Sequence, residues 1–192
     1  MNFIFDVGNV LVEYAPVVYL RRLFSDEDLI NKMVNVIFKS PEWLQMDEGF
    51  LLHKEATEIF CKREPEYIDA IKTVMQNFDK TFFPLSDTIN LLPEIKKAGH
   101  DLYYLSNIHV EIRDHLVNNH DFFDLFIGGV FSCDINHIKP SPEIYRYLLT
   151  TYSLNPQDCV FFDDMEENVE AAEKEGIKSV HFTTAECVLK FM

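Results

Sequence analysis

The sequence predicts an α/β fold: a parallel β-sheet flanked by helices, with a block of helices inserted after the first strand. After residue 83, short apolar stretches alternate with segments of helical periodicity, an order that produces βαβ units and a parallel sheet. Between residues 15 and 82, by contrast, the apolar residues have helical spacing and no convincing strand is found. The 192 residues suit one compact domain or a core with a modest insertion.

The first strand begins almost at the N-terminus. Residues 2–7 form an apolar run in which Asp6 stands near the C-terminal end, and Gly8 and Asn9 follow as a turn signal. Ligands of open parallel sheets bind beyond the carboxyl ends of the strands. A carboxylate at this position is therefore a candidate site residue.

Residues 15–82 are expected to form a helical insertion into a core made of residues 1–14 and 83–192. Asp26 and Ser40-Pro41 have the composition of helix starts, and Glu48-Gly49 that of a break between helices. Helical spacing is found over residues 17–24, 26–38, 50–61 and 66–78.

The second half of the chain supplies the other strands of the sheet and the helices that connect them. Strands are expected over residues 101–105, 126–131, 159–162 and 178–182. Helices are expected over residues 86–98, 110–119, 142–152, 167–175 and 185–190.

The overall charge limits the classes of partner. There are 17 Lys and Arg residues against 32 Asp and Glu residues, a formal net charge of −15. So acidic a surface repels nucleic acids and anionic lipids, and neither is expected as a partner.

The sequence shows no signal peptide and no membrane-spanning apolar run, so a cytoplasmic protein is expected. The four cysteines form no CxxC pair and are expected to be reduced and buried. The oligomeric state cannot be read from the sequence.

Reactive side chains stand at four places that a parallel sheet would bring to one edge. They are Asp6, Ser106-Asn107, Lys139-Pro140 and Asp163-Asp164. A carboxylate can attack phosphorus to form an aspartyl-phosphate, and two further carboxylates can offer hard oxygen ligands to Mg²⁺. A lysine can neutralise charge on a phosphoryl group, while a serine hydroxyl and backbone N–H groups bind its other oxygens. The set therefore predicts Mg²⁺-dependent phosphoryl transfer.

Each of these residues, taken alone, also has a structural explanation. Asp6 could serve in a turn, Ser106 as a helix cap and Lys139 as a solvated lysine. Asp163 and Asp164 could cap the next helix, but the repulsion between adjacent carboxylates after an apolar strand is best relieved by a cation. The functional interpretation rests on the four sites occurring together.

These motifs resemble, in order and over nearly the whole chain, those of the haloacid dehalogenase-like hydrolases. The matching segments are Asp6-Val7-Gly8-Asn9-Val10, Leu105-Ser106-Asn107, Lys139-Pro140 before a helix, and Phe162-Asp163-Asp164 with Asn168 on the following helix. The resemblance implies a Rossmann-like core with a small α-helical cap, which closes over the site and helps to select the substrate.

The resemblance also implies roles for the acidic residues. Asp6 would be both the nucleophile and a Mg²⁺ ligand. The backbone carbonyl of Gly8 would be a second ligand, and Asp164 the principal acidic ligand, with Asp163 beside it. Asn168 would support this metal-binding loop.

The phosphoryl group would be bound by other residues, according to the same resemblance. Ser106 would bind it with help from the backbone of Asn107. Lys139 would pair with both Asp6 and the phosphate. The implied partner is a small phosphorylated metabolite, such as a sugar phosphate.

The sequence departs from the family at Gly8, where a second Asp usually stands two residues after the nucleophile. In the family, that Asp is the general acid for the leaving group and then the base for water. General acid–base catalysis contributes roughly 10²–10⁴-fold, so slow turnover is expected, or a substrate with a good leaving group such as a sugar 1-phosphate or acyl phosphate. The Asp-x-Gly-Asn-Val form also resembles a bacterial branch that includes glucose-1-phosphate phosphatases, which favours an active phosphatase.

Other functions remain as alternatives. A catalytically weak or idle protein that binds phosphorylated metabolites is compatible with Gly8. A dehalogenase would not need the Asp163-Asp164 pair, a phosphomutase would need a proton-handling residue at Gly8, and a receiver-type phosphoacceptor has its acidic pair early in the chain.

Within the helical insertion, Phe38, Trp43 and Met46 are candidates to face a substrate, although core packing is the more common role for each. The turn at residues 46–49 is equally compatible with facing the site and with a plain helix–helix connection. His109 is expected to be a loop residue without a role.

Overall fold

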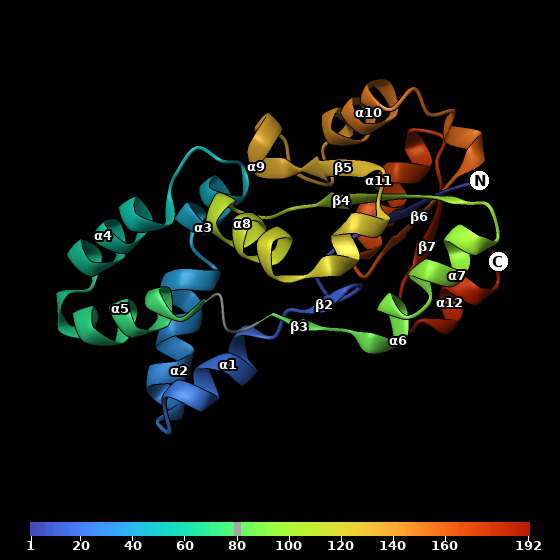
Figure 1. Cartoon of the computed structure of the whole chain (residues 1–192). Helices are drawn as coiled ribbons and strands as arrows, with labels where there is room; N and C mark the ends of the chain where they lie inside the picture. The colour runs from blue at the N-terminus through green and yellow to red at the C-terminus, as the bar shows by residue number, and fades with distance from the viewer. Residues whose placement is uncertain (79–81) are drawn as a thin grey trace.

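The protein, described by a computed structural model over residues 1–78 and 82–192, contains a parallel sheet and a group of helices at one end (Figure 1). The strands are β1 (Asn2–Phe5), β2 (Val12–Glu13), β3 (Phe83–Pro84), β4 (Asp101–Ser106), β5 (Gly128–Phe131), β6 (Cys159–Asp163) and β7 (Lys178–His181). The helices up to β3 are α1 (Pro16–Leu23), α2 (Glu27–Met33), the π-helix η1 (Val34–Phe38), α3 (Pro41–Asp47), α4 (His53–Arg63), the 3₁₀-helix η2 (Pro65–Tyr67) and α5 (Ile68–Gln76). Those after β3 are α6 (Ser86–Ile89), α7 (Leu92–Lys97), α8 (Val110–Asn119), η4 (Asp121–Leu125), α9 (Ser132–Ile135), α10 (Pro142–Thr151), η5 (Pro156–Asp158), α11 (Glu166–Lys174) and α12 (Glu186–Leu189).

The main sheet has the strand order β5-β4-β1-β6-β7, and its pairings are parallel. The N-terminal strand β1 is therefore central, with β4 and β6 as its neighbours. The chain crosses from one side of β1 to the other between β5 and β6, and ligands of such sheets bind at this kind of switch point. The predicted α/β fold with a parallel sheet is confirmed.

Both faces of the sheet are buried. Along β1, Phe3 and Phe5 belong to one apolar cluster and Ile4 to another, as the two-residue period of a strand requires. The Ile4 cluster includes apolar residues of α10 and α11, while the other includes residues of α7, α8 and α12. Each large apolar side chain buried in this way contributes about 1.5–3 kcal/mol to stability, so β1 is a rigid support for the residue that follows it.

The helices α1 to α5 lie at one end of the molecule, and the two termini lie at the other (Figure 1). Two of their starts were predicted correctly: Asp26 accepts hydrogen bonds from Asp28 and Leu29 N–H groups, and Ser40 from the Trp43 N–H. Of the predicted insertion 15–82, residues 79–81 lie outside the described residues. The short antiparallel strands β2 and β3, which were not predicted, pair at the two points where the chain passes between the helices and the sheet.

Several predicted bounds were wrong. The expected helix 86–98 consists of two helices, α6 and α7, and Pro93 stands in the first turn of α7, where it interrupts no helical hydrogen bond. The expected helix 50–61 begins only at His53, because the chain first passes the left-handed Gly49. The cysteines are free, but only Cys133 and Cys159 are buried.

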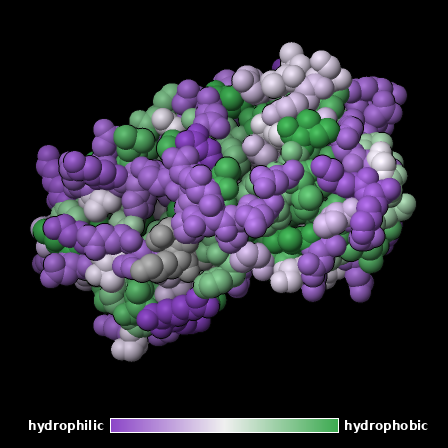
Figure 2. All heavy atoms as spheres, viewed as in Figure 1, coloured by the Kyte–Doolittle hydropathy of each residue, from purple (hydrophilic) through white to green (hydrophobic). Residues whose placement is uncertain are grey.

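The surface seen in Figure 2 is largely hydrophilic over the α1–α5 end, in keeping with the net charge of −15.

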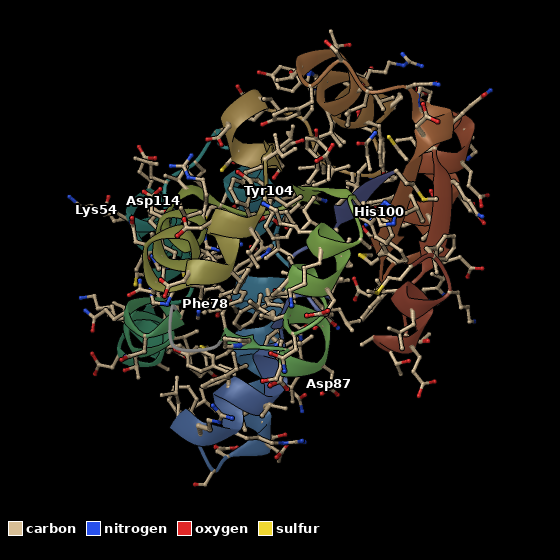
Figure 3. All side chains as sticks on the ribbon, turned by 45° about the vertical axis from the view of Figure 1, so that its right-hand side comes forward. Lys54, Phe78, Asp87, His100, Tyr104 and Asp114 are labelled. Carbon is tan, nitrogen blue, oxygen red and sulfur yellow. The ribbon has the colours of Figure 1, made fainter. Side chains whose placement is uncertain are left out.

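At the junction of α4 and α8, the His53 N–H donates to Glu111 Oε1 at 2.9 Å, while the exposed Lys54 and Asp114 mark the outer side of these helices (Figure 3). Among the described residues, no helix combines the length and apolarity needed to cross a membrane.

Candidate active site

Asp6 follows the last residue of the central strand and continues its alignment. Its backbone N–H donates to the carbonyl of Phe162 at 2.9 Å, so the sheet fixes the backbone of Asp6. Its carboxylate accepts a hydrogen bond from the Val7 N–H at 2.6 Å. Asp6 as a whole is 7% exposed. One carboxylate oxygen is therefore held in place at the carboxyl edge of the sheet.

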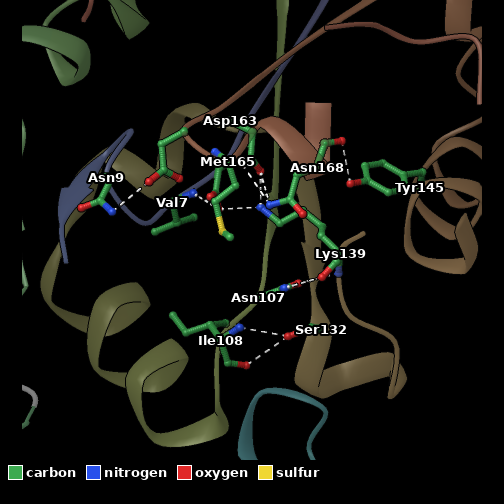
Figure 4. Close-up of polar contacts among 12 residues, drawn as sticks. Val7, Asn9, Asn107, Ile108, Ser132, Lys139, Tyr145, Asp163, Met165 and Asn168 are labelled. Carbon is green, nitrogen blue, oxygen red and sulfur yellow. Dashed lines mark hydrogen bonds and ion pairs between the residues drawn. The ribbon is translucent and has the colours of Figure 1, made fainter. Parts of the chain in front are cut away.

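Lys139 lies between two carboxylates. Its Nζ is 2.9 Å from Asp6 Oδ1 and 2.6 Å from Asp163 Oδ2, and the side chain is buried. The Asn107 side chain binds both polar groups of the Lys139 backbone (Figure 4). Asn107 Nδ2 donates to the Lys139 carbonyl at 2.8 Å, and the Lys139 N–H donates to Asn107 Oδ1 at 2.7 Å. The pairing of Lys139 with Asp6 was expected, whereas this role of the Asn107 side chain was not.

Asp163 and Asp164 point to different partners. Asp163 is fully buried, and it accepts hydrogen bonds from Asn168 Nδ2 at 3.0 and 3.1 Å and from the Met165 N–H at 2.8 Å (Figure 4). Asp164 is less buried, and its Oδ2 accepts a hydrogen bond from Asn9 Nδ2 at 2.9 Å. The Asn168 side chain therefore orients Asp163, whereas Asp164 is the more accessible of the two carboxylates.

The acidic residues form a group that fits a hard cation. One oxygen each of Asp6, Asp163 and Asp164 can be chosen so that all lie within 4.8 Å of one another. Three carboxylates against the single ammonium of Lys139 leave two negative charges, which a divalent cation would balance. The all-oxygen donor set is the kind that Mg²⁺ prefers.

Burial and neighbouring charges shift the pKa values of Asp6 and Lys139. Burial raises the pKa of the Asp6 carboxyl to about 7; Lys139 opposes that rise, while Asp163 and Asp164 add to it. Burial alone would lower the pKa of the Lys139 ammonium, but Asp163 and Asp6 offset this and raise it. Lys139 is therefore a permanent cation next to Asp6.

A cavity of about 210 Å³ opens over these groups. Most of the site residues predicted from the sequence line it: Asp6, Gly8, Ser106, Asn107, Lys139, Asp164 and Asn168. Ser106, at the end of β4, is 2% exposed. Asp163 does not line the cavity but stands behind Lys139 and Asn168. The topology thus brings the predicted residues together, with Asp163 one layer deeper than the others.

The other residues of the cavity wall include Tyr14, Trp43, Asp47, Phe82 and His109. Of the three candidates in the insertion, Trp43 lines the cavity, while Met46 is buried in the core and Phe38 packs against the Trp43 ring at a centroid distance of 4.9 Å. Asp47, in the turn for which two interpretations were open, lines the cavity.

His109 was expected to be a loop residue without a role; it does lie in the loop before α8, but this loop forms part of the cavity wall. His109 precedes α8, is 2% exposed, and neither of its ring nitrogens has a hydrogen-bond partner in the part of the chain that the structure describes. Burial, together with nearby His53, lowers its pKa to about 3. Its position three residues after Ser106, just beyond a strand that ends at the site, was a signal that could have identified it.

The comparisons with known proteins agree with this arrangement. A profile of haloacid dehalogenase-like hydrolases matches residues 1–176. The chain is 35% identical over 201 residues to a phosphorylated carbohydrates phosphatase from Thermotoga maritima, covering 93% of this chain and 82% of that protein. It is 26% identical over 181 residues to the sesquiterpene phosphatase astK from Aspergillus oryzae, covering 94% of this chain and 88% of that protein. Some other curated relatives are longer, and the chain spans 10% to 33% of their length.

A solved structure shows the same fold. The HAD family enzyme bt-2542 from Bacteroides thetaiotaomicron, in a variant complexed with magnesium and inorganic phosphate, superposes with a TM-score of 0.75 at 18% identity, covering 95% of this chain and 94% of that one. The match to the family profile over most of the chain, the relative from Thermotoga maritima and the convergence of the motifs at one sheet edge lead to one conclusion: this chain belongs to the haloacid dehalogenase-like hydrolases.

Proposed function

We propose that this protein is a Mg²⁺-dependent phosphatase that hydrolyses a small phosphomonoester through an aspartyl-phosphate on Asp6. The observation that carries the proposal is the position of the Asp6 carboxylate. It follows the central strand, borders the cavity and lies 2.9 Å from the Lys139 ammonium. A carboxylate in this position can act as a nucleophile towards phosphorus.

The metal would be held by Asp6, Asp164 and the backbone carbonyl of Gly8, with Asp163 close behind. The two negative charges left after pairing with Lys139 support this assignment. When bound, Mg²⁺ would supply charge neutralisation for the phosphoryl group.

The chain's own residues account for binding and transfer. The Ser106 hydroxyl and the backbone of Asn107 bind phosphoryl oxygens, and Lys139 stabilises the negative charge on the group being transferred. The Asp6 oxygen forms a bond to phosphorus as the bond between phosphorus and the ester oxygen breaks. Water then attacks the same phosphorus, and inorganic phosphate leaves Asp6 free.

The substrate is expected to be a small phosphorylated metabolite, such as a sugar phosphate. A cavity of about 210 Å³ suits a compact molecule. A relative that is 35% identical is named a phosphorylated carbohydrates phosphatase, which supports the sugar class. Residues 15–82 would act as a cap domain over a core of residues 1–14 and 83–192, since Trp43 and Asp47 of α3 contribute to the cavity wall.

The test is the release of inorganic phosphate from a generic aryl phosphate and a panel of phosphorylated metabolites, with and without Mg²⁺. Asp6→Asn should lower the rate of phosphate release by at least about a thousandfold, because it removes the nucleophile. Asp87→Asn on α6, which is exposed (Figure 3), is the matched control and should have wild-type activity. Equal activity of wild type and Asp6→Asn, or activity that survives chelation of Mg²⁺, would contradict the proposal.

A second candidate, a protein that binds phosphorylated metabolites without turnover, is favoured by Gly8 alone. It predicts phosphorylation of Asp6 by a reactive acyl phosphate and no catalytic release of phosphate. Incubation with acetyl phosphate and intact-mass measurement over several hours distinguishes a stable phosphoprotein from a transient one.

Metal binding can be measured without activity. Mg²⁺ at about 100 times its dissociation constant should raise the free energy of unfolding by roughly 2.7 kcal/mol. Urea unfolding with and without Mg²⁺ measures this gain. The gain should be lost in Asp164→Asn and kept in Asp87→Asn.

A further inference from the structure

The site lacks an obvious proton donor at the position where the family has one. Residue 8 is glycine, and among the described residues a Cβ built there would meet only Tyr14 Cβ, at 4.0 Å. The backbone at Gly8 has a negative φ, since Gly8 is not among the glycines with positive φ. The fold therefore does not require glycine at this position, and the acid–base group has to come from elsewhere in the cavity.

Among the described residues, the cavity offers few candidates for that role. The titratable lining residues within 1–78 and 82–192 are Asp6, Tyr14, Asp47, His109, Lys139 and Asp164. The proposed function already uses Asp6, Lys139 and Asp164. Tyr14, Asp47 and His109 are left.

We propose that Asp47 is the general acid that protonates the leaving oxygen and then the general base that activates water. The proposal rests on the phosphatase function proposed above. It assigns to a residue of the helical insertion the task that the family usually gives to a residue beside the nucleophile.

The backbone around Asp47 is fixed to the core. The Ser132 hydroxyl of α9 donates to the Asp47 carbonyl at 2.5 Å, and Asn136 Nδ2 donates to the Glu48 carbonyl at 2.6 Å. Gly49 packs so closely on α9 that a Cβ would lie 2.3 Å from the Cys133 carbonyl oxygen. These contacts fix the position of the end of α3 relative to α9.

The Asp47 side chain itself is uncommitted. It lines the cavity, and within residues 1–78 and 82–192 no hydrogen bond or ion pair reaches its carboxylate. Asp47 is half-buried, and its carboxylate is open to the cavity. A substrate oxygen or a water there would be its partner.

The chemistry of the surroundings separates Asp47 from the other two candidates. Burial raises the pKa of Asp47 to about 7, and the neighbouring Glu48 adds to this. Burial and the charge of Asp47 raise the pKa of Tyr14 well above its ordinary value, which makes Tyr14 a weak acid. His109 has a pKa of about 3 and is neutral at physiological pH. On α9, Cys133 also faces Asp47, but its thiol has a pKa raised to about 12 and stays neutral.

Near pH 7, Asp47 is therefore the candidate with both protonation states available, which suits a group that first gives and then takes a proton. In the first step Asp6 bonds to phosphorus, the ester P–O bond breaks, and the Asp47 proton moves to the leaving oxygen. In the second step the Asp47 carboxylate takes a proton from water, whose oxygen bonds to phosphorus while the bond to Asp6 breaks. Asp47 is protonated again at the end.

The experiment compares two classes of substrate in Asp47→Asn. For an alkyl phosphate, whose leaving group needs a proton, kcat should fall by roughly 10²–10⁴-fold. For p-nitrophenyl phosphate, whose leaving group does not, a burst of about one equivalent of nitrophenol per enzyme should precede a slow steady state, because only the attack by water still needs the base. Rescue should follow from Gly8→Asp in the Asp47→Asn background.

Two matched variants complete the design. Asp69→Asn, an exposed change on α5 of the insertion, should behave as wild type. Asp47→Glu keeps a carboxyl group, so its kcat should still change with pH near neutrality. In Asp47→Asn this change should be lost. Unchanged turnover of the alkyl phosphate by Asp47→Asn, or the loss of the burst in this variant while it remains folded, overturns the role of Asp47. Activity that persists in Asp6→Asn overturns the phosphatase mechanism instead, so the two failures are distinguishable.

Discussion

The Ser132 hydroxyl donates a hydrogen bond to the Asp47 carbonyl, 2.5 Å away, and this contact joins the end of α3 to the start of α9. The same hydroxyl accepts a hydrogen bond from the Ile108 N–H at 2.9 Å. Ser132 thus fixes the helical insertion and the loop after β4 to one point. The position of Asp47 in the cavity depends on it.

Ser132→Ala should lower both stability and turnover. The Ile108 N–H loses its acceptor and the Asp47 carbonyl its donor, a cost of about 1–3 kcal/mol. Alkyl phosphate turnover should fall several-fold with little change in KM. Urea unfolding and steady-state kinetics measure the two effects. Ser179→Ala, which removes a hydroxyl bonded to the Ile177 carbonyl, is the control, since neither residue lines the cavity. A kcat loss of equal size in both variants would refute a specific link to Asp47.

Gly49→Ala should be more damaging than the same change at Gly99. Both glycines have positive φ, 76° and 85°, so both substitutions strain the backbone by about 1–2 kcal/mol. At Gly99 no atom lies within 4 Å of a built Cβ, whereas at Gly49 the Cys133 carbonyl oxygen lies at 2.3 Å. The difference in the free energy of unfolding isolates the steric contact with α9. Only Gly49→Ala should also lower kcat, since it displaces Asp47.

Asn168→Ala should weaken Mg²⁺ binding while leaving the nucleophile in place. The Asn168 amide bonds both oxygens of Asp163, and its own backbone carbonyl accepts the Tyr145 hydroxyl at 3.0 Å. Loss of an outer residue that orients a metal-site carboxylate typically costs roughly 10–100-fold in metal affinity. A Mg²⁺ titration of activity and of thermal stability measures this shift. Asn155→Ala, which removes a surface amide bonded to Asp158, should leave the titration unchanged.

The pH dependence of stability should reveal the raised pKa of the half-buried Asp47 carboxyl. Its pKa is about 7 in the folded protein and about 3.9 in an unfolded chain. Because the folded value is the higher, the stability associated with this group is present at low pH and is lost as pH rises through 7. Asn cannot ionise. Relative to Asp47→Asn, the wild type should therefore lose about 1–2 kcal/mol between pH 5 and pH 8, since solvent in the cavity screens part of the effect.

Urea unfolding at several pH values, with the metal chelated, measures that difference. Asp69→Asn should show no such divergence from wild type, because Asp69 is exposed in the folded protein. Parallel stability curves for wild type and Asp47→Asn would contradict a raised pKa of Asp47 in the folded protein.

Much of the core site could be predicted because a parallel sheet converts sequence order into spatial order. Asp6 directly follows β1, Ser106 ends the adjacent strand β4, and Asp163 ends β6 on the other side of β1. Once strands with apolar runs are recognised, their final residues must share an edge. Lys139 follows from the same logic, although its tie to the Asn107 side chain does not.

The contribution of the helical insertion could not be predicted in the same way. Asp47 lies at the end of a short helix whose direction is set by contacts with α9, some 85 residues away in sequence. No local pattern encodes such a contact. The two-residue strands β2 and β3 were missed because a two-residue strand has no periodicity to detect. The burial of His109 likewise depends on the rings of Trp43 and Phe78, which come from the insertion.

The space above Gly8 bears on where a proton-transfer group could stand. Among the described residues, a Cβ at residue 8 meets nothing nearer than 4.0 Å, so this position has room for the start of a side chain. If Asp47 has the proposed role, the proton-transfer group and Trp43 of the cavity wall stand on the same helix, α3. A change in the position of that helix would then alter substrate fit and proton transfer at once.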